Sequence, residues 1–368
     1  MKNEEKETDS LHISKKKIAE IQNNPQKIAK AAHLIYVSDE SDPCIRRKKY
    51  GKYFRYFVDN KPLKDKQVKE RIEKLVIPPA WENVWICIEE NGHLQATGYD
   101  SKGRKQYLYH PAWVELRNQS KFYRMIQFAQ SLPAIRMQVE KDLSSRKLSQ
   151  QKVLATIVCL MERTNIRVGN NVYEKLYGSY GLTTLRDKHI DIKGSTINFA
   201  FKGKKGVYRD VSLRNSRLAR IVQQCKEIPG KELFQYYGED GKRHSIDSGM
   251  VNDYIRDITG KDFSAKDFRT WAGTVNAFIA LKELGCGKTQ REIQKNLVQA
   301  LDQVAAQLGN TRAVCKKYYV HPLITKLYEN DKLSDYYQAL DSIETNHQKT
   351  DLTPEEKTIL SILEKHKY

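Results

Sequence analysis

The sequence predicts an α+β protein with two domains, a small β-rich one followed by a larger, mainly helical one. Two observations lead to this prediction. From Tyr53 to about Trp113, aromatic and β-branched residues are separated by turns that contain Gly or Asn. After about residue 118, apolar residues recur at helical spacing. The 368 residues are enough for two hydrophobic cores. We expect a polar leader (1–30), an N-terminal β-rich domain (31–118) and a helical domain (119–368).

The first domain is expected to contain two clear strands and one helix. The strands are predicted for YFRYFVD and VWICIEE, which are rich in aromatic and β-branched residues. The helix is predicted for KDKQVKERIEKLV, and it should end before Pro78 and Pro79. The leader contains one short amphipathic stretch around Ile18, Ile21 and Ile28. A dense basic run, RRKKYGKYFR, follows the leader, with aromatic residues between its charges.

The second domain shows strong helix signals around one β-rich segment. Ser149 is placed to cap the helix SQQKVLATIVCLMERT, and LTTLRDKHIDIKGSTINFAFKGKKGVYRDVSL predicts three short strands with Gly-rich turns. The predicted helix REIQKNLVQALDQVAAQL is followed by Gly309, which can adopt the left-handed conformation common at the C-terminus of a helix. A last helix in LTPEEKTILSILEKHKY begins with a Thr353 cap and a capping box completed by Glu356.

The charge of the chain indicates the kind of partner. The formal net charge is +19, and such an excess needs a partner with dense negative charge. Nucleic acid is the first candidate and an anionic membrane surface is the second. The membrane alternative is weak, because no run of about 18 apolar residues exists and the charged N-terminus is not a secretory signal.

Neither a metal centre nor an ATP site is predicted. The six cysteines are far apart without a CxxC pair, and the nine histidines form no HxxxH or HExxH pair. We interpret the cysteines as reduced thiols of a cytosolic protein. The segment GCGKT resembles the end of a nucleotide-binding loop, but Lys282 stands where that loop needs a glycine.

Two adjacent tyrosines, Tyr318 and Tyr319, follow two lysines in NTRAVCKKYYVHP. A phenol has a pKa of about 10, so it is neutral at pH 7 and is a weak nucleophile. A tyrosine that attacks a DNA phosphodiester therefore needs other catalytic groups. Without a metal, fixed cations must stabilise the added negative charge, arginine suits phosphate best, and the leaving 5′-oxygen needs a general acid. Candidates in distinct settings are Arg167 in TNIRVGN, Lys204 at a hairpin tip in FKGKKG, and Arg269 in AKDFRTWAGT. Taken singly, each is most often a surface charge, and spacing alone does not select them.

Seven motifs together give the chain a specific resemblance. In order they are DSKGRKQYLYHPAW, LMERTNIRVGN, GLTTLRDKHI, FKGKKG, IDSGMVNDYI, AKDFRTWAGTVNA and LGNTRAVCKKYYVHP. With these motifs the chain resembles the poxvirus-like type IB DNA topoisomerases, in particular their bacterial branch, from about residue 45 to 325. The resemblance implies a β-rich N-terminal domain and a mainly helical catalytic domain of the tyrosine recombinase/type IB topoisomerase type, which close around duplex DNA as a clamp.

The resemblance also implies a role for each site residue. Tyr319 would attack the phosphodiester and form a 3′-phosphotyrosyl link, while Arg167 and Arg269 hold the non-bridging oxygens. Lys204 would be the general acid, and Lys266, one turn before Arg269, would support the site. Supercoils would then relax by strand rotation, without ATP, metal or other cofactor. Where poxvirus enzymes carry a histidine this chain has Asn310, which can donate a hydrogen bond but cannot titrate near neutral pH.

The first domain is expected to contact DNA in two ways. The resemblance points to RKQYLY, with Tyr107 and Tyr109 on one strand face reaching the major groove. The alternative is that both tyrosines pack inward. Basic residues of the earlier run would add attraction to the backbone that is independent of sequence. The expected DNA-binding residues are Arg104, Gln106, Tyr107, Tyr109, Arg46, Arg47, Lys48, Lys49 and, in the second domain, Lys266.

Two other functions fit part of this pattern. A tyrosine recombinase shares the covalent chemistry, but such enzymes typically carry HxxR, and here Lys266 lies three residues before Arg269. A non-catalytic architectural protein could use the same basic surface. For the favoured reading we expect a monomer that acts on double-stranded DNA, without a membrane, in the cytoplasm at the nucleoid.

The choice between the two tyrosines rests mainly on the resemblance. Neighbours on a helix point about 100° apart, so only one of the pair can face a given phosphate. Tyr318 lies one turn from Val314, which suits packing, and Tyr319 lies one turn from Cys315. Relatives usually carry a small residue at the position of Tyr318. The nine-residue step from Asn310 and the following VHP select Tyr319, and we predict that Tyr318 cannot replace it.

Overall fold

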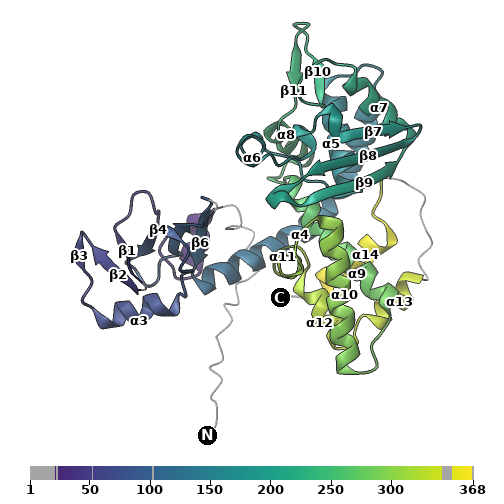
Figure 1. Cartoon of the computed structure of the whole chain (residues 1–368). Coiled ribbons are helices and arrows are strands. Elements are labelled where there is room, and N and C mark those ends of the chain that lie inside the picture. Colours follow the sequence, from purple (N-terminus) through teal and green to yellow (C-terminus); the bar gives the residue numbers. More distant parts are fainter. Residues whose placement is uncertain (1–20, 22–23, 52, 102, 342–349, 367–368) are drawn as a thin grey trace. The chain divides into compact units, whose positions relative to one another are not determined.

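The chain contains two compact units, one extending to Arg124 and the other comprising Met125–Lys367 (Figure 1). The computed structural model describes residues 21, 24–51, 53–101, 103–341 and 350–366. The division between the units falls within helix α4 (Pro111–Leu143). The first unit is mainly β-sheet and the second is mainly helical, so the predicted α+β class is confirmed.

The first unit is built on a six-stranded antiparallel sheet with the order β3-β2-β1-β4-β5-β6. The two predicted strands are present as β2 and β4. The basic run, however, is itself strand β1, which turns at Gly51 and pairs with β2 so that Lys48 lies opposite Arg55. Its consecutive cations hide the alternation that normally identifies a strand. The strands are β1 (Cys44–Tyr50), β2 (Tyr53–Val58), β3 (Lys61–Pro62), β4 (Glu82–Cys87), β5 (Leu94–Tyr99) and β6 (Lys105–Tyr109).

Two short helices cover parts of this sheet unit. Helix α3 (Lys66–Lys74) begins at an Asp65 cap, and its Ile72 packs in a core with Ile45 and Ile86. Helix α2 (Pro25–Ala31) buries Ile28 against Trp113 and Leu116 together with Ile21. The end of the predicted leader therefore contributes to a core, while Ile18 lies outside the described residues.

Helix α5 (Gln150–Thr164) is the centre of the second unit. It begins at the predicted Ser149 cap, most of its residues are buried, and it contacts α7, α8, α9, β9 and β10. The three predicted strands form an antiparallel sheet, β7-β8-β9, and Lys204 lies at the tip between β8 and β9. The other elements before α9 are α6 (Asn171–Tyr177), β7 (Ile190–Lys193), β8 (Thr196–Lys202), β9 (Tyr208–Arg214), α7 (Ser216–Lys226), β10 (Gln235–Tyr237), β11 (Arg243–Ser245) and α8 (Ser248–Thr259).

The C-terminal part of the second unit is a group of helices that ends with α14. Gly309 follows α10 with a φ of 59°, and Thr353 and Glu356 form the predicted capping box of α14. The GCGKT segment connects α9 to α10, without the preceding strand that a nucleotide-binding loop needs. These helices are α9 (Ala265–Leu284), α10 (Gln290–Leu308), α11 (Arg312–Tyr318), α12 (Pro322–Glu329), α13 (Ser334–Asp341) and α14 (Pro354–Lys365).

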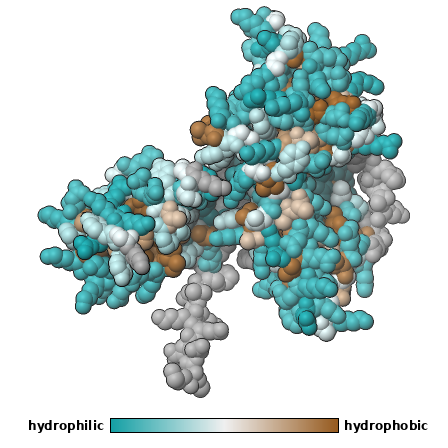
Figure 2. Space-filling view, in the orientation of Figure 1, coloured by the Kyte–Doolittle hydropathy of each residue, from teal (hydrophilic) through white to brown (hydrophobic). Residues whose placement is uncertain are grey.

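The face of the molecule in Figure 2 is mostly hydrophilic, with apolar residues scattered between charged ones. Of the helices described, none is both long enough and apolar enough to span a membrane.

Candidate active site

The C-terminal end of α10 collects arginines from three other parts of the second unit. Arg209 on β9 donates to the carbonyl oxygens of Ala306, at 3.0 Å, and Gln307, at 2.8 Å. Arg269 on α9 donates to the Leu308 carbonyl at 2.7 Å, and Arg167 donates to the Gly309 carbonyl at 3.3 Å. The last carbonyls of a helix lack partners within the helix and carry the negative end of its dipole. Four successive carbonyls therefore hold three guanidinium groups close together.

Each of the two predicted catalytic arginines is fixed by a second contact. Arg269 is only 5% exposed, and it also donates to the carbonyl of Asn165. Asn165 ends α5 in a left-handed conformation, so its carbonyl is free to accept this bond. Arg167, two residues further along, donates to the side-chain oxygen of Asn310 at 2.5 Å. The ends of α5 and α10 thus hold both arginines in place.

The pKa values of these cations show how crowded the site is. Burial lowers the pKa of Arg269, and the charge of nearby Arg167 lowers it further. Loss of solvation lowers the pKa of Lys204, and Arg167 adds to that effect. Burial and then Arg167 also lower the pKa of Arg209. Only Arg269 is fully buried, and Lys204 is exposed. Like charges held close together are unfavourable on their own, so this group is suited to bind an anion.

Two buried donors in this region have no hydrogen-bond partner among the residues that the structure describes. Nε of Arg269 and Nδ2 of Asn310 are both buried without a hydrogen bond. Leaving a buried donor unsatisfied costs roughly 1–3 kcal/mol, and such groups are rare in folded proteins. Both donors are therefore available to an anion that enters this region. This observation comes from the geometry and is independent of any motif.

Tyr319 lies beside this cationic group, whereas Tyr318 does not. The guanidinium carbon of Arg269 is 5.5 Å from the centre of the Tyr319 ring, which is partly buried. Tyr318 ends α11, is 45% exposed, and its ring lies 5.4 Å from the ammonium group of Lys317. Tyr318 is therefore one of the exposed large side chains of the described part of the chain. The end of the helix turns Tyr319 inward and leaves Tyr318 in solvent.

Gly273 and Thr274 on α9 hold the backbone of Tyr319. A Cβ atom on Gly273 would lie 2.8 Å from Cβ of Tyr319, so only glycine allows this approach. The Thr274 hydroxyl donates to the Tyr319 carbonyl at 3.1 Å and accepts from the His321 amide at 3.0 Å. Sequence reasoning missed both residues, although they follow the predicted Arg269 by four and five positions in the same motif, AKDFRTWAGT. A glycine inside a helix was the available signal, because it often marks a close backbone contact.

Lys204 and Lys266 complete the predicted group in the second unit. The ammonium group of Lys204 lies 5.2 Å from the centre of the Tyr173 ring on α6. Lys266 is exposed at the start of α9, one turn before buried Arg269. Lys266 therefore faces solvent, where DNA could reach it.

The predicted DNA-contacting residues of the first unit fall into two groups. Tyr107 and Tyr109 stack on one face of β6 with ring centres 6.0 Å apart. Tyr107 is 47% exposed, whereas Tyr109 packs against Trp113, so the inward alternative holds for Tyr109 alone. Gln106 and Arg104 both donate to the Asp100 carboxylate.

The four cations of β1 also divide. Arg46, Lys48 and Lys49 are exposed. Arg47 instead donates to the carbonyls of Ile77, Pro78 and Trp81, at 3.1, 3.0 and 2.7 Å. The guanidinium of Arg47 therefore anchors the loop between α3 and β4.

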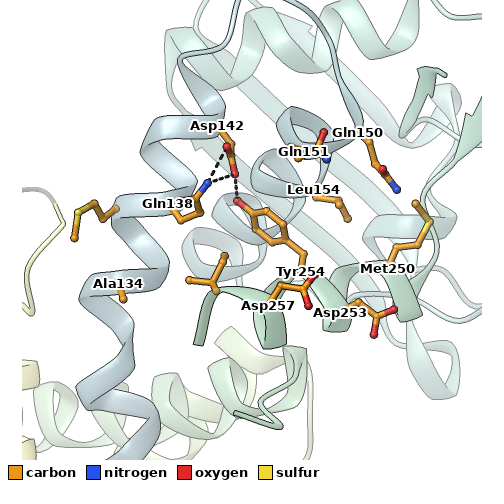
Figure 3. A pocket seen from close by; sticks show the side chains of 12 residues that line it. Ala134, Gln138, Asp142, Gln150, Gln151, Leu154, Met250, Asp253, Tyr254 and Asp257 are labelled. Atoms are coloured by element: carbon orange, nitrogen blue, oxygen red, sulfur yellow. Dashed lines mark hydrogen bonds between the residues drawn. The ribbon is translucent and has the colours of Figure 1, made fainter. Parts of the chain in front are cut away.

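A separate cavity of about 700 Å³ lies between α4, α5 and α8 (Figure 3). Tyr254 donates to Asp142 at 2.6 Å across this cavity, and Gln138 donates to the same carboxylate. Asp253 and Asp257 also line it. None of the predicted catalytic residues lines the cavity, and its carboxylates would repel a phosphate.

The arrangement around Tyr319 places a tyrosine beside several fixed cations, as an enzyme that acts on a phosphate group would require. Comparison with known families agrees with this interpretation. Residues 110–347 match the family described as "Eukaryotic DNA topoisomerase I, catalytic core". Residues 53–100 match "Bacterial DNA topoisomerase IB, N-terminal domain". The chain belongs to the type IB DNA topoisomerases.

Individual relatives carry the same name. The chain is 35% identical over 295 residues to DNA topoisomerase 1B of Acanthamoeba polyphaga mimivirus, covering 78% of this chain and 88% of the relative. It is 23% identical over 296 residues to DNA topoisomerase 1B of Vaccinia virus (strain Copenhagen), covering 76% and 90%. The predicted family is confirmed, and the recombinase and architectural alternatives are not supported.

Proposed function

We propose that Tyr319 is the nucleophile of this DNA topoisomerase. Its phenolic oxygen attacks a DNA phosphorus, the bond from phosphorus to the 5′-oxygen breaks, and a 3′-phosphotyrosyl link remains. Rotation of the free 5′-hydroxyl end relaxes the duplex, and attack by that hydroxyl reverses the link. The link conserves the energy of the bond, so the cycle needs no ATP. The observation that supports this proposal is the group of fixed cations, with buried Arg269 among them, beside Tyr319.

The other residues take roles that their geometry supports. Arg167 and Arg269 stabilise the non-bridging oxygens, because fixed guanidinium groups need little reorganisation when negative charge develops. Asn310, whose oxygen is held by Arg167, gives its unpaired Nδ2 to the same phosphate. Lys204 protonates the 5′-oxygen as it leaves. Its lowered pKa makes it a better proton donor than an ordinary lysine.

We further propose how DNA is held. Arg46, Lys48, Lys49 and Lys266 attract the backbone, while Gln106 and Tyr107 reach a groove. Arg104 and Tyr109 support that strand, and Arg47 is not part of the contact. The two units close around duplex DNA as a clamp, and the enzyme acts as a monomer in the cytoplasm at the nucleoid, without membrane attachment.

Plasmid relaxation in EDTA without ATP tests the assignment. Tyr319→Phe should lower the rate on the order of 10⁴-fold or more and abolish the covalent adduct, while DNA binding is retained. Tyr318→Phe is the matched control, and it should relax plasmid at close to the normal rate. Mass spectrometry of the trapped peptide should place the nucleotide on Tyr319. If the adduct maps to Tyr318, the nucleophile is misassigned.

A further inference from the structure

Arg209 is the one member of the arginine group at the end of α10 that the proposed chemistry does not use. It lies on β9, five residues after Lys204, and thus belongs to the hairpin that carries the proposed general acid. Its two terminal nitrogens donate to the carbonyls of Ala306 and Gln307. The next two carbonyls accept from Arg269 and Arg167. Arg209 therefore ties the Lys204 hairpin to the same helix end that positions the phosphate-binding arginines.

Two glycines make room for this side chain. A Cβ atom on Gly309 would lie 2.8 Å from Nη1 and 3.0 Å from Cδ of Arg209. A Cβ atom on Gly203 would lie 3.3 Å from Cγ of Arg209. The side chain thus passes under the residue just before Lys204 and ends against the residue just before Asn310. This close fit at both ends distinguishes it from a solvated surface arginine.

The contact also has an electrostatic cost that a purely structural link would not need. Burial lowers the pKa of Arg209, and the charge of Arg167 lowers it further. The dipole of α10 and two charge-assisted hydrogen bonds offset that cost. A guanidinium can donate to two neighbouring carbonyls at once, whereas an ammonium group cannot reproduce that fork.

We infer that Arg209 is a positioning residue for acid catalysis: it sets the distance between Lys204 and the phosphate held by Arg167, Arg269 and Asn310. Arg209 does not touch the DNA. The inference rests on the proposed role of Lys204 as the general acid. Its loss should impair proton transfer to the 5′-oxygen more than attack by Tyr319, because the nucleophile is held separately by α9.

Single-turnover cleavage of two DNA substrates tests this inference. One has the ordinary 5′-oxygen, and the other has a bridging 5′-sulfur, whose leaving group needs no acid. With the oxygen substrate, Arg209→Ala should cleave roughly 10- to 100-fold more slowly, because a misplacement of about 1 Å can cost that much. With the sulfur substrate its rate should return to within a few-fold of normal. With the oxygen substrate, Arg209→Lys, which keeps the charge, should cleave at a rate between those of Arg209→Ala and the unaltered enzyme.

Two controls make the result specific. Arg214→Ala removes an exposed arginine from the same strand and should cleave both substrates normally. Lys204→Ala tests the proposed function itself, and it should be rescued by sulfur. Equal slowing of Arg209→Ala on both substrates, or no slowing, would overturn the inference while leaving Lys204 as the acid. Should Lys204→Ala lack rescue, the acid role fails and the inference fails with it. If Arg209→Ala does not fold, the oxygen-to-sulfur ratio of Arg209→Lys decides.

Discussion

Strand β1 and the end of α10 both gather positive charge, but they do so in opposite ways. On β1 the side chains of Arg46, Lys48 and Lys49 are exposed. Around α10 the guanidinium of Arg269 is nearly buried and is held by two carbonyls. The exposed cations keep their solvation and freedom, whereas the buried ones have lost both. A cationic side chain that attracts the DNA backbone can remain mobile. A cationic side chain that stabilises a transition state must be held in position before the reaction.

The cations on β1 also repel one another, although less strongly than the cations at the end of α10. Lys48 lies directly opposite Arg55, and like charges across a strand pair are unfavourable. Aromatic rings offset part of this, since Arg55 lies 4.7 Å from the Tyr50 ring and Lys48 lies 5.0 Å from the Phe57 ring. The comparison predicts that the identity of a cation matters at α10 and that only its charge matters at β1.

Exchange of arginine for lysine should separate the two regions most strongly. Arg269→Lys keeps the charge but loses the two-carbonyl geometry, so we expect cleavage to slow by about 10²- to 10³-fold. Arg46→Lys is the matched exchange on β1, and it should leave cleavage and binding unchanged. Single-turnover cleavage with saturating DNA compares the cleavage rates of the two variants. Comparable losses in the two variants would contradict the distinction between fixed and loose cations.

The pH dependence of cleavage sharpens the role of Lys204. A general acid works only when protonated, so the rate should fall as pH rises through the Lys204 pKa. That pKa is lowered from the ordinary value of 10.5, so the fall should begin at a lower pH than for a lysine with an ordinary pKa. Rates measured at low DNA concentration report the free enzyme. The alkaline fall should be absent with a 5′-sulfur substrate, and its persistence there would assign the titration to another group.

A buried ion pair should set stability rather than chemistry. Glu356 on α14 accepts from Arg136 on α4, at 2.8 and 2.9 Å, and from the Trp271 indole at 3.0 Å. Burial opposes the charge of Arg136, but Glu356 and Glu162 raise its pKa overall. Glu356→Ala would leave Arg136 without its main partner, so the free energy of unfolding should fall by about 3–5 kcal/mol.

The unfolding experiment has a neighbouring control. Glu355→Ala removes a carboxylate from the same turn of α14 and should change stability by less than about 0.5 kcal/mol. Urea denaturation measures both variants. Equal small losses would mean that Arg136 finds another partner when Glu356 is absent.

The smallest effect should come from the exposed cations. The double variant Arg46→Ala/Lys48→Ala removes two proposed phosphate contacts, so binding should weaken by a similar factor for all DNA sequences. The slope of log K against log salt should become shallower by about 1.8. The cleavage rate with saturating DNA should stay the same. A sequence-dependent loss would instead indicate contacts with base edges.

Much of the fold followed from local signals. The Ser149 and Thr353 caps and the left-handed Gly309 mark helix ends through contacts within a few residues, and these predictions were confirmed. Strand β1 was missed, because its charges obscure the alternation and its partner strands lie elsewhere in the chain. For the same reason the end of the leader was not recognised as part of a core: Ile28 packs against Trp113, far away in sequence.

The sequence by itself determined the fold class, the positions of most helices and, through seven motifs, the family and the candidate site residues. Only the tertiary structure decided how those residues are held. The end of α10 brings together arginines from α9, β9 and the segment after α5, and it reveals Arg209, which no motif singled out. The tertiary structure also places Tyr319 against Gly273 and leaves Tyr318 exposed. The reason is physical: caps and periodicity act over neighbouring residues, whereas burial and shared carbonyls join segments that are distant in the chain.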